Sequence, residues 1–493
     1  MPLIRKELIG IVLNRATSLI DFCIHNDINK QVEFMKQIVF NDNSLNKSER
    51  MKAIEILTKD IDYYKVLYNE GEKRICENCK EECLATYYCE YCVRSFLIKN
   101  FLEWSSNNDG IDKLIKNCQI RTLSPKKIIE WIPFDKFKNI NYLTRGGFSE
   151  IFEADWIGGC FNKWDSKRRK LIRSGDIKVI LKRLQNVESA DRNWFEEAET
   201  HSNISSNKRP VIVQCYGLTQ DKNNKYFLVM AKMDTDLRKY LQENNKSLTW
   251  KERISIVSNI INSLYIIHNE KAIHRDLHSG NILYSKKIDY WYISDFGFCG
   301  PADKPLKTIY GNLPYVAPEV LVGRNYTFAS DIYSIAILMW EMSSGRPPFF
   351  NRDHNYDLAI NIVNGMRPKI VPETPLDYEN LMKQCWDADP LKRPSIETLL
   401  IKIREIKKSH YHIIPNDLMI GDNAKVPEYL SLTQLFKLMS QPIDEKVYEN
   451  NSSSKLYHFE GLPEPRNATE EEQEKFHSKP HDFNIPYNIN DIQ

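Results

Sequence analysis

Residues His274–Gly297 read HRDLHSGNILYSKKIDYWYISDFG. It places Asp276 and Asn281 in one short loop, and a second acidic residue, Asp295, follows nineteen positions after Asp276. An aspartate can accept the proton of a substrate hydroxyl, and amide and carboxylate oxygens are the hard ligands that magnesium prefers. The apolar run between them is broken by a polar turn, which would bring these groups together. Phosphoryl transfer from a nucleotide needs these parts.

The motifs HRDxxxxN and DFG resemble the catalytic loop and the magnesium loop of the eukaryotic protein kinases. The resemblance implies that Asp276 is the catalytic base and that Asn281 and Asp295 bind Mg²⁺. It also implies the α+β bilobal protein-kinase fold over residues 134–408, with a small β-rich N-terminal lobe and a mainly helical C-terminal lobe. A small helical and zinc-ribbon-like region would precede this fold.

The expected phosphate loop matches the family pattern only in part. INYLTRGGFSEIFEADW alternates like two strands around a glycine turn, where protein kinases carry GxGxxGxV over the nucleotide phosphates. Gly146 and Gly147 remain, whereas Thr144 and Ser149 stand in place of the first and third glycines and Ile151 in place of the valine. The loop therefore has less conformational freedom than the family's loop. Taken alone, GGFS would be an ordinary turn. Its distance from the other motifs favours the interpretation as a phosphate loop.

Lys182 in KVILKRL resembles the lysine of the family's VAIK strand, which would hold the α and β phosphates of ATP. By the family pattern its anionic partner is Glu197 in WFEEAETH, although the facing direction must decide between Glu197 and Glu196. Met230 fits the position at the back of the adenine pocket. The resemblance assigns the nucleotide site to Leu143, Gly146, Gly147, Ile151, Lys182, Glu197, Met230, Met233, Asn281 and Asp295.

The segment after DFG ends at Ala317–Glu319, which matches the family's APE motif. Arg275 beside the catalytic aspartate indicates control by a phosphorylated residue in this segment, because a guanidinium binds phosphate in a bidentate manner. Thr308 and Tyr310 are the candidates. The alternative is that both are plain loop hydroxyls.

Two features of the C-terminal lobe continue the resemblance. SDIYSIAILMWEMSSGRPPF resembles the buried helix whose aspartate, here Asp331, anchors the catalytic loop. The family pattern also pairs Glu319 with Arg393. Loss of either member of such a buried ion pair costs about 3 to 5 kcal/mol.

Five cysteines lie within seventeen residues, in ICENCKEECLATYYCEYCVR. Cys76 with Cys79 and Cys89 with Cys92 form two CxxC pairs, which could supply four thiolates to one structural Zn²⁺. The gap between the pairs is shorter than is usual for zinc ribbons, and Cys83 is an additional candidate ligand. The alternative is a group of reduced cysteines packed between helices.

The chain divides into further regions by its pattern. Residues 1–70 predict three amphipathic helices, which either form a packing module or bind a partner, and residues 96–133 predict a helical connector after the cysteine module at 71–95. Residues 158–175 are rich in Lys and Arg and predict a solvated loop. Residues 409–493 predict a mostly disordered tail, because they contain few apolar residues to offset the entropy of ordering.

Composition limits the environment and the partners. The 493 residues carry a formal net charge of only +2 with both signs intermixed, so we expect neither a nucleic-acid nor a membrane partner. The apolar runs near the start are too short for a secretory signal or a membrane span. Eleven cysteines without such a signal indicate reduced thiols or metal ligands. We therefore expect a cytoplasmic protein, with the nucleus as an alternative.

The expected function is ATP-dependent phosphorylation of a protein hydroxyl in intracellular signalling. His278 and Asn312 stand where Ser/Thr kinases usually carry Lys and Thr, and neither position matches the tyrosine-kinase pattern. We favour Ser/Thr specificity, and dual specificity stays open. The dipeptide Cys385–Trp386 before Arg393 resembles the pattern of tyrosine kinases and of tyrosine-kinase-like Ser/Thr kinases. Together with the cysteine module, it resembles the lineage-expanded fungal kinases of that group. The alternative function is a pseudokinase scaffold that binds nucleotide or partners without transferring phosphate.

Overall fold

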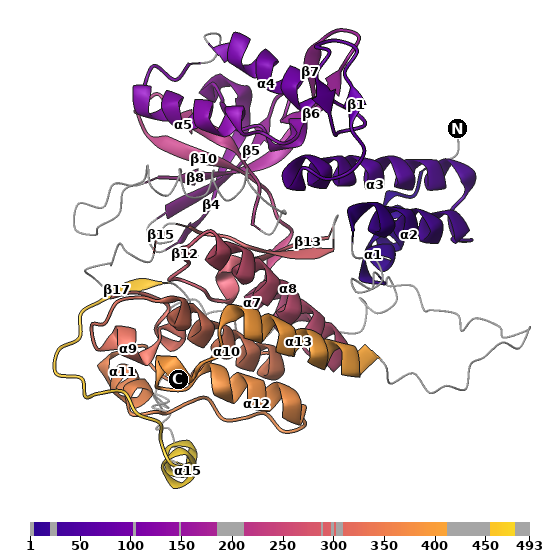
Figure 1. Ribbon diagram of the computed structural model, residues 1–493. Helices are drawn as coiled ribbons and strands as arrows, with labels where there is room; N and C mark the ends of the chain where they lie inside the picture. The colour runs from indigo at the N-terminus through magenta and orange to yellow at the C-terminus, as the bar shows by residue number, and fades with distance from the viewer. Residues whose placement is uncertain are drawn as a thin grey trace, which may run out of the picture.

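The computed structural model describes residues 4–19, 27–101, 105–146, 149–184, 212–286, 289–296, 300–301, 309–411 and 454–478. A β-rich lobe and a helical lobe lie one above the other, and the N-terminal helices lie to one side (Figure 1). The expected α+β bilobal architecture is confirmed. Among these residues, no helix is both long enough and apolar enough to cross a lipid bilayer.

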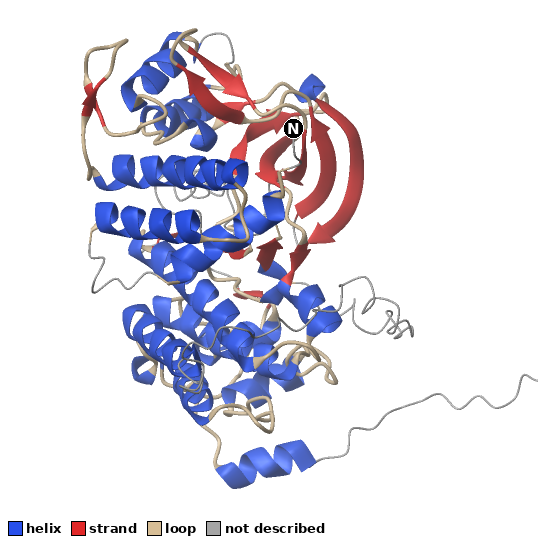
Figure 2. Cartoon of the chain, turned by 90° about the vertical axis from the view of Figure 1, so that its right-hand side faces the viewer, coloured by secondary structure: helices blue, strands red, loops and turns tan. Residues whose placement is uncertain are grey.

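The β-rich lobe is built on one strongly curved six-stranded sheet, visible in Figure 2. The strand order is β3-β9-β10-β8-β5-β4, and all neighbours are antiparallel except β3 and β9. The strands are β3 (Glu130–Trp131), β4 (Phe137–Gly146), β5 (Ser149–Trp156), β8 (Ile177–Arg183), β9 (Cys215–Gln220) and β10 (Tyr226–Ala231).

The short parallel strand β3 extends this sheet beyond the predicted start of the kinase domain at residue 134. Its neighbour on β9 is Gly217, which has a φ of +150°, and a Cβ atom there would lie 1.8 Å from the carbonyl oxygen of Glu130. Only glycine allows this approach. The last residues of the predicted connector therefore belong to the kinase sheet.

The helical lobe has one large apolar core. Its helices are α7 (Leu237–Asn244), α8 (Trp250–Asn269), α9 (Pro318–Leu321), α10 (Phe328–Ser344), α11 (Tyr356–Val363), α12 (Leu376–Cys385) and α13 (Ile396–Tyr411). Helix α10 is buried on nearly all sides from Ser330 to Ser343. An all-round apolar helix of this kind forms the centre of a large core.

Three helices, α1 (Lys6–Ser18), α2 (Ile28–Asn41) and α3 (Lys47–Tyr68), form the N-terminal region with an apolar core of their own. After the cysteine module come α4 (Glu90–Lys99) and α5 (Asp109–Ile120). Apolar residues of α5, among them Ile111 and Ile115, pack against residues of β9 and β10 such as Leu218 and Leu228. Helix α5 therefore covers one face of the kinase sheet.

The prediction of a solvated loop at 158–175 is wrong. It contains a β-hairpin, β6 (Phe161–Asp165) and β7 (Lys170–Arg173), in which Trp164 pairs with Leu171. Both side chains are buried in a cluster with Tyr88 and Val93 of the cysteine region. The basic residues that suggested a solvated loop alternate with these apolar ones, so one face of the hairpin is buried and the other is charged.

The predicted disordered tail also differs from the structure in part. Residues 454–478 contain β17 (Lys455–Tyr457) and α15 (Glu470–Ser478), both on the helical lobe (Figure 1). Strand β17 pairs with β16 (Ile309–Gly311) of the segment that follows DFG. Few side chains are needed for this contact, because backbone hydrogen bonds form the strand pair.

The ion pair expected between Glu319 and Arg393 is present. Arg393 donates from Nη1 and Nη2 to the two carboxylate oxygens of Glu319 at 2.7 and 2.8 Å, and both side chains are buried, at 0% and 3% exposure. Nη1 also donates to the carbonyl of Ala329 at 2.9 Å. The pair joins the end of the segment after DFG to the loop before α13.

We expect Glu319→Gln to lower the free energy of unfolding by about 3 to 5 kcal/mol, because it leaves the buried guanidinium uncompensated. The matched control is Glu379→Gln on α12, which removes a partly exposed pair with Lys383 and should cost no more than about 0.5 kcal/mol. Urea denaturation of both variants measures the difference. Equal losses would contradict a special role for the buried pair.

Candidate active site

One buried carboxylate, on helix α10, holds the catalytic loop in place. Asp331 of α10 accepts hydrogen bonds from the backbone N–H groups of His274 at 2.8 Å and Arg275 at 3.0 Å, and it contacts Nε2 of His268 at 2.9 Å. Burial raises the pKa of Asp331, but the hydrogen bonds from His268 and from the backbone of Arg275 outweigh it and hold the pKa below its usual range. The loop therefore rests on a carboxylate that stays ionised.

The backbone of the loop is strained at the residues that present its functional groups. Arg275 has a φ of +70° and Asp295 a φ of +59°. Non-glycine residues adopt such angles rarely, and they concentrate at active sites, where the surrounding structure stabilises them. Here His274 spans the two segments, because its Nε2 lies 3.0 Å from the carbonyl oxygen of Ser294.

The structure brings together the four residues proposed for catalysis. Nδ2 of Asn281 donates to the backbone carbonyl of Asp276 at 2.8 Å, and its distance to Oδ2 of Asp276 is 3.4 Å. Nζ of Lys182 lies 2.6 Å from Oδ1 of Asp295. Since the amide nitrogen of Asn281 faces Asp276, its amide oxygen is the atom that can bind a cation together with Asp295.

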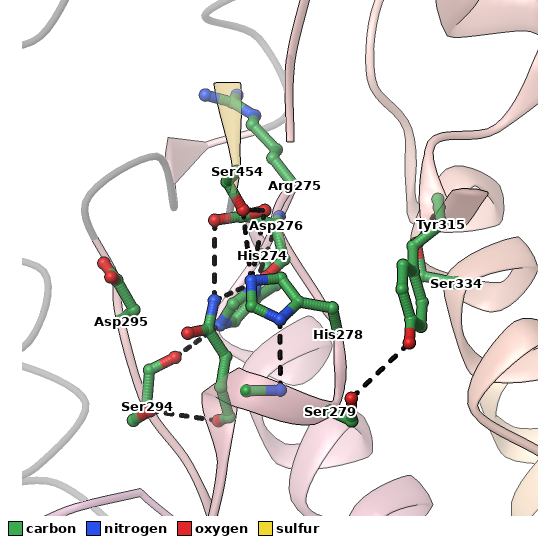
Figure 3. A network of polar contacts seen from close by, with 12 residues as sticks. His274, Arg275, Asp276, His278, Ser279, Ser294, Asp295, Tyr315, Ser334 and Ser454 are labelled. Carbon is green, nitrogen blue, oxygen red and sulfur yellow. Dashed lines mark hydrogen bonds and ion pairs between the residues drawn. The ribbon is translucent and has the colours of Figure 1, made fainter. Parts of the chain in front are cut away.

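A serine from the distant tail completes the group around Asp276, as Figure 3 shows. Ser454 Oγ donates to Oδ1 of Asp276 at 2.8 Å and lies 3.1 Å from Nε2 of His278. The other ring nitrogen of His278 accepts from the backbone N–H of Gly280 at 3.1 Å. That bond places the ring proton on Nε2, so His278 donates to Ser454 and Ser454 donates to Asp276.

Burial sets the charge of the two loop histidines. It lowers the pKa of His274, and it lowers the pKa of His278 to about 3, with Arg238 adding to the effect. Both imidazoles are therefore neutral at physiological pH. Where Ser/Thr kinases usually carry a lysine, this chain places a neutral hydrogen-bond donor.

A second buried network supports the loop from the side of α10. Glu341 accepts from Ser279 Oγ at 2.8 Å and from the Tyr315 hydroxyl, and Arg238 Nε donates to Ser279 Oγ at 3.2 Å. Burial raises the pKa of Glu341. Sequence reasoning missed Glu341, Tyr315 and Arg238, because their role depends on contacts between distant segments.

The nucleotide side of the site is described in part. Ile151 lies beside both Thr144 and Lys182 in the sheet register, Leu143 is 49% exposed, and Met230 on β10 is buried next to the partly buried Met233. Gly146 pairs with Ser149 at the end of the β4–β5 hairpin. The predicted residues Gly147, Glu197 and Thr308, and the side chain of Tyr310, lie outside the described part of the chain.

The cysteine module brings four of its thiols together. Cys76, Cys79, Cys89 and Cys92 place their sulfurs within 4.8 Å of one another, with Cys76–Cys92 at 3.7 Å and Cys79–Cys89 at 3.6 Å. Four sulfurs bound tetrahedrally at about 2.3 Å would be spaced about 3.8 Å apart. The sulfurs therefore fit a tetrahedral metal ion. Cys83 is buried and lies near Cys89 and Glu90, outside the set of four.

Comparison with known proteins agrees with this geometry. A family model described as protein tyrosine and serine/threonine kinase matches residues 137–403. A probable LIM domain-containing serine/threonine-protein kinase of Dictyostelium discoideum is 30% identical over 219 residues, which are 44% of this chain and 33% of that protein. Serine/threonine-protein kinase VIK of Arabidopsis thaliana is 29% identical over 298 residues, which are 57% of this chain and 61% of VIK.

The chain thus spans less than two thirds of the length of these relatives. The family match, in contrast, covers more than half of the chain and includes both the β-rich lobe and the helical lobe. It also contains Lys182, Asp276, Asn281 and Asp295. On this evidence, the chain belongs to the protein tyrosine and serine/threonine kinase family.

Proposed function

We propose that the protein transfers the γ-phosphoryl group of ATP to serine or threonine hydroxyls of proteins. The observation that carries this proposal is the position of Asp276, whose carboxylate accepts a hydrogen bond from a serine hydroxyl at 2.8 Å, as a catalytic base must. The relatives named above are serine/threonine-protein kinases by their names, which supports this acceptor class.

Each residue of the site has a defined task in this reaction. Asp276 takes the hydroxyl proton, and Lys182 holds the phosphates as a point charge. Asn281 and Asp295 would bind Mg²⁺, which neutralises charge on the transferring phosphoryl group when it is bound. The partly buried apolar side chains beside Met230, which include Ile180, Met233 and Leu283, form a surface for the adenine ring.

The alternative function is nucleotide or partner binding without phosphoryl transfer. It draws support from the substitutions Thr144 and Ser149 in the glycine loop, which limit how closely the backbone can approach phosphate. It does not account for the polar set, because a scaffold has no need of a proton acceptor, a phosphate lysine and two magnesium ligands. Intact catalytic groups therefore favour the enzyme.

The group assignment within the family is also a proposal. Cys385 and Trp386 before Arg393, together with HRDLHSGN, support membership of the tyrosine-kinase-like group. The narrower fungal assignment stays a prediction, because the relatives named above come from an amoeba and a plant.

We expect Asp276→Asn to lower kcat for a protein acceptor at least about 100-fold, because general-base catalysis contributes about 10²- to 10⁴-fold. ATP binding should persist, since Lys182 and Asp295 are unchanged. Asp289→Asn, an exposed aspartate on the turn between β13 (Ile282–Ser285) and β14 (Tyr290–Ile293), is the control and should keep full activity. Transfer of labelled phosphate to casein with Mg-ATP measures both; a wild-type protein that binds ATP but labels nothing would support the scaffold.

We also propose that Cys76, Cys79, Cys89 and Cys92 bind one structural Zn²⁺. Four thiolates close the coordination shell, so the ion would hold the module together without taking part in the reaction. The module contacts the kinase insertion directly, because Asn78 Nδ2 donates to the carbonyl of Ser166 at 3.0 Å. Metal binding would therefore order the β6–β7 hairpin as well.

Metal analysis of the full chain should find one zinc per molecule. Cys79→Ser should remove it. The control Cys160→Ser, at a cysteine that packs against the kinase sheet and lies outside the group of four, should keep it. Chelation should increase amide hydrogen exchange in residues 74–92 and 161–173 together, since metal binding and local folding are coupled. Protein purified without chelators that contains no metal would contradict the site.

A further inference from the structure

The tail strand β17 lies where a peptide substrate would have to lie. Lys455, Leu456 and Tyr457 pair antiparallel with Gly311, Tyr310 and Ile309, respectively, in the segment that leads to APE. The residue before this strand is Ser454, which is 5% exposed and reaches Asp276. An extended peptide that adds a strand to an existing edge is a common mode of peptide recognition.

The Ser454 hydroxyl has the orientation of a phosphoryl acceptor. Its proton points to Oδ1 of Asp276, and Nε2 of His278 donates to its oxygen (Figure 3). Asn281, which holds Asp276 from the other side, and Asp295 are the residues proposed to bind Mg²⁺. The hydroxyl is therefore adjacent to the position that the γ-phosphate would take.

The rest of the tail segment is fastened to the helical lobe and fixes the position of Ser454. Gln473 Nε2 donates to the carbonyl of Gly365 at 2.7 Å, and Asn467 accepts from the backbone N–H of Ala388 at 2.9 Å. Phe476 of α15 is buried in the large core and meets Phe349 edge to face, with ring centroids 6.3 Å apart. A displaced tail would expose the Phe476 side chain to water, so this packing stabilises the docked position of the segment.

We propose that residues 454–457 occupy the protein-substrate site of their own chain and that Ser454 is phosphorylated there. This inference rests on the proposed function and adds to it a modification site and a form of regulation. Until the reaction takes place, the segment excludes other acceptors from Asp276.

The reaction balances with ATP as the only co-reactant. Ser454 Oγ attacks the γ-phosphorus, and a new O–P bond forms as the bond from that phosphorus to the β–γ bridging oxygen breaks. The Oγ proton passes to the carboxylate of Asp276, and ADP leaves. Asp276 then returns the proton to solvent.

The geometry also limits the acceptor class. The backbone of β17 runs beside Gly311, where a Cβ atom would lie 3.0 Å from Val316 Cγ2 and 3.5 Å from Oδ1 of Asp276. Ser454, the residue before the partner of Gly311 on β17, reaches the carboxylate with a short side chain at 2.8 Å. A tyrosine side chain is too long to place its hydroxyl there from the same backbone position, so the site selects short hydroxyl side chains.

Phosphorylation would release the segment. A phosphoserine carries a charge of about −1.5 to −2 at neutral pH, and beside a carboxylate it is repelled. The tail would therefore act as a substrate once and then leave the site open to other proteins.

The first test maps phosphate in dephosphorylated full-length protein after addition of Mg-ATP. We expect phosphate on Ser454, with a rate constant that does not change over a 100-fold range of protein concentration, as an intramolecular step requires. Ser454→Ala should lose this phosphopeptide, Ser453→Ala should keep it, and Asp276→Asn should label neither Ser454 nor casein.

The outcomes separate this inference from the proposed function. Labelled casein with an unmodified Ser454 overturns the inference and leaves the kinase activity standing. A rate proportional to protein concentration overturns the intramolecular step. No label on either acceptor overturns both.

The second test releases the tail without touching the catalytic residues. Phe476→Ala should lower the KM for casein about tenfold or more with kcat unchanged, because a site open in a minor fraction of molecules binds external acceptors in proportion to that fraction. Amide exchange should rise in residues 309–311 and 455–457 together. Unchanged KM and exchange would overturn the docking, whereas a fall in kcat alone would indicate general damage and count against it.

Discussion

Asp331 is the constraint on which the site depends. A single buried carboxylate binds two consecutive backbone N–H groups of the catalytic loop and the imidazole of His268. These bonds stabilise the positive φ of Arg275, and that angle in turn directs Asp276 toward the acceptor. Because hydrogen bonds to a buried charge are stronger than neutral ones, the core helix α10 can keep the loop in a conformation that its own residues disfavour.

The polar groups of the site balance one another before any ligand arrives. Lys182 has Asp295, Glu341 has Ser279 and Tyr315, and Asp276 has Asn281 and the tail serine. Buried charges without partners would be costly, so an external acceptor hydroxyl has to replace the contact of Asp276 with Ser454 as it enters. Substrate binding is thus an exchange of partners, and its strength is the difference between two sets of contacts.

The sequence predicts the parts of this site that lie close together along the chain. The motifs HRDxxxxN and DFG predict the catalytic loop by resemblance, and the two CxxC pairs predict a set of four thiols that the structure brings together. The remaining parts depend on contacts between distant segments. Trp164 and Leu171 are single apolar residues in a basic stretch, and the ladder between β16 and β17 is made by backbone groups, which leave no side-chain pattern. Composition alone could therefore not distinguish residues 454–478 from a disordered segment.

The two-residue strand β3 has a consequence for the kinase domain as a separable unit. It covers the outer edge of β9 at Gly217, and α5 covers the adjoining apolar face with Ile111 and Ile115. An unprotected sheet edge beside an exposed apolar face is a template for association between molecules. A domain excised at residue 137 would lack both β3 and α5 and would expose this edge and this apolar face. The region ahead of the catalytic domain therefore shields surfaces through which the isolated domain would be expected to associate.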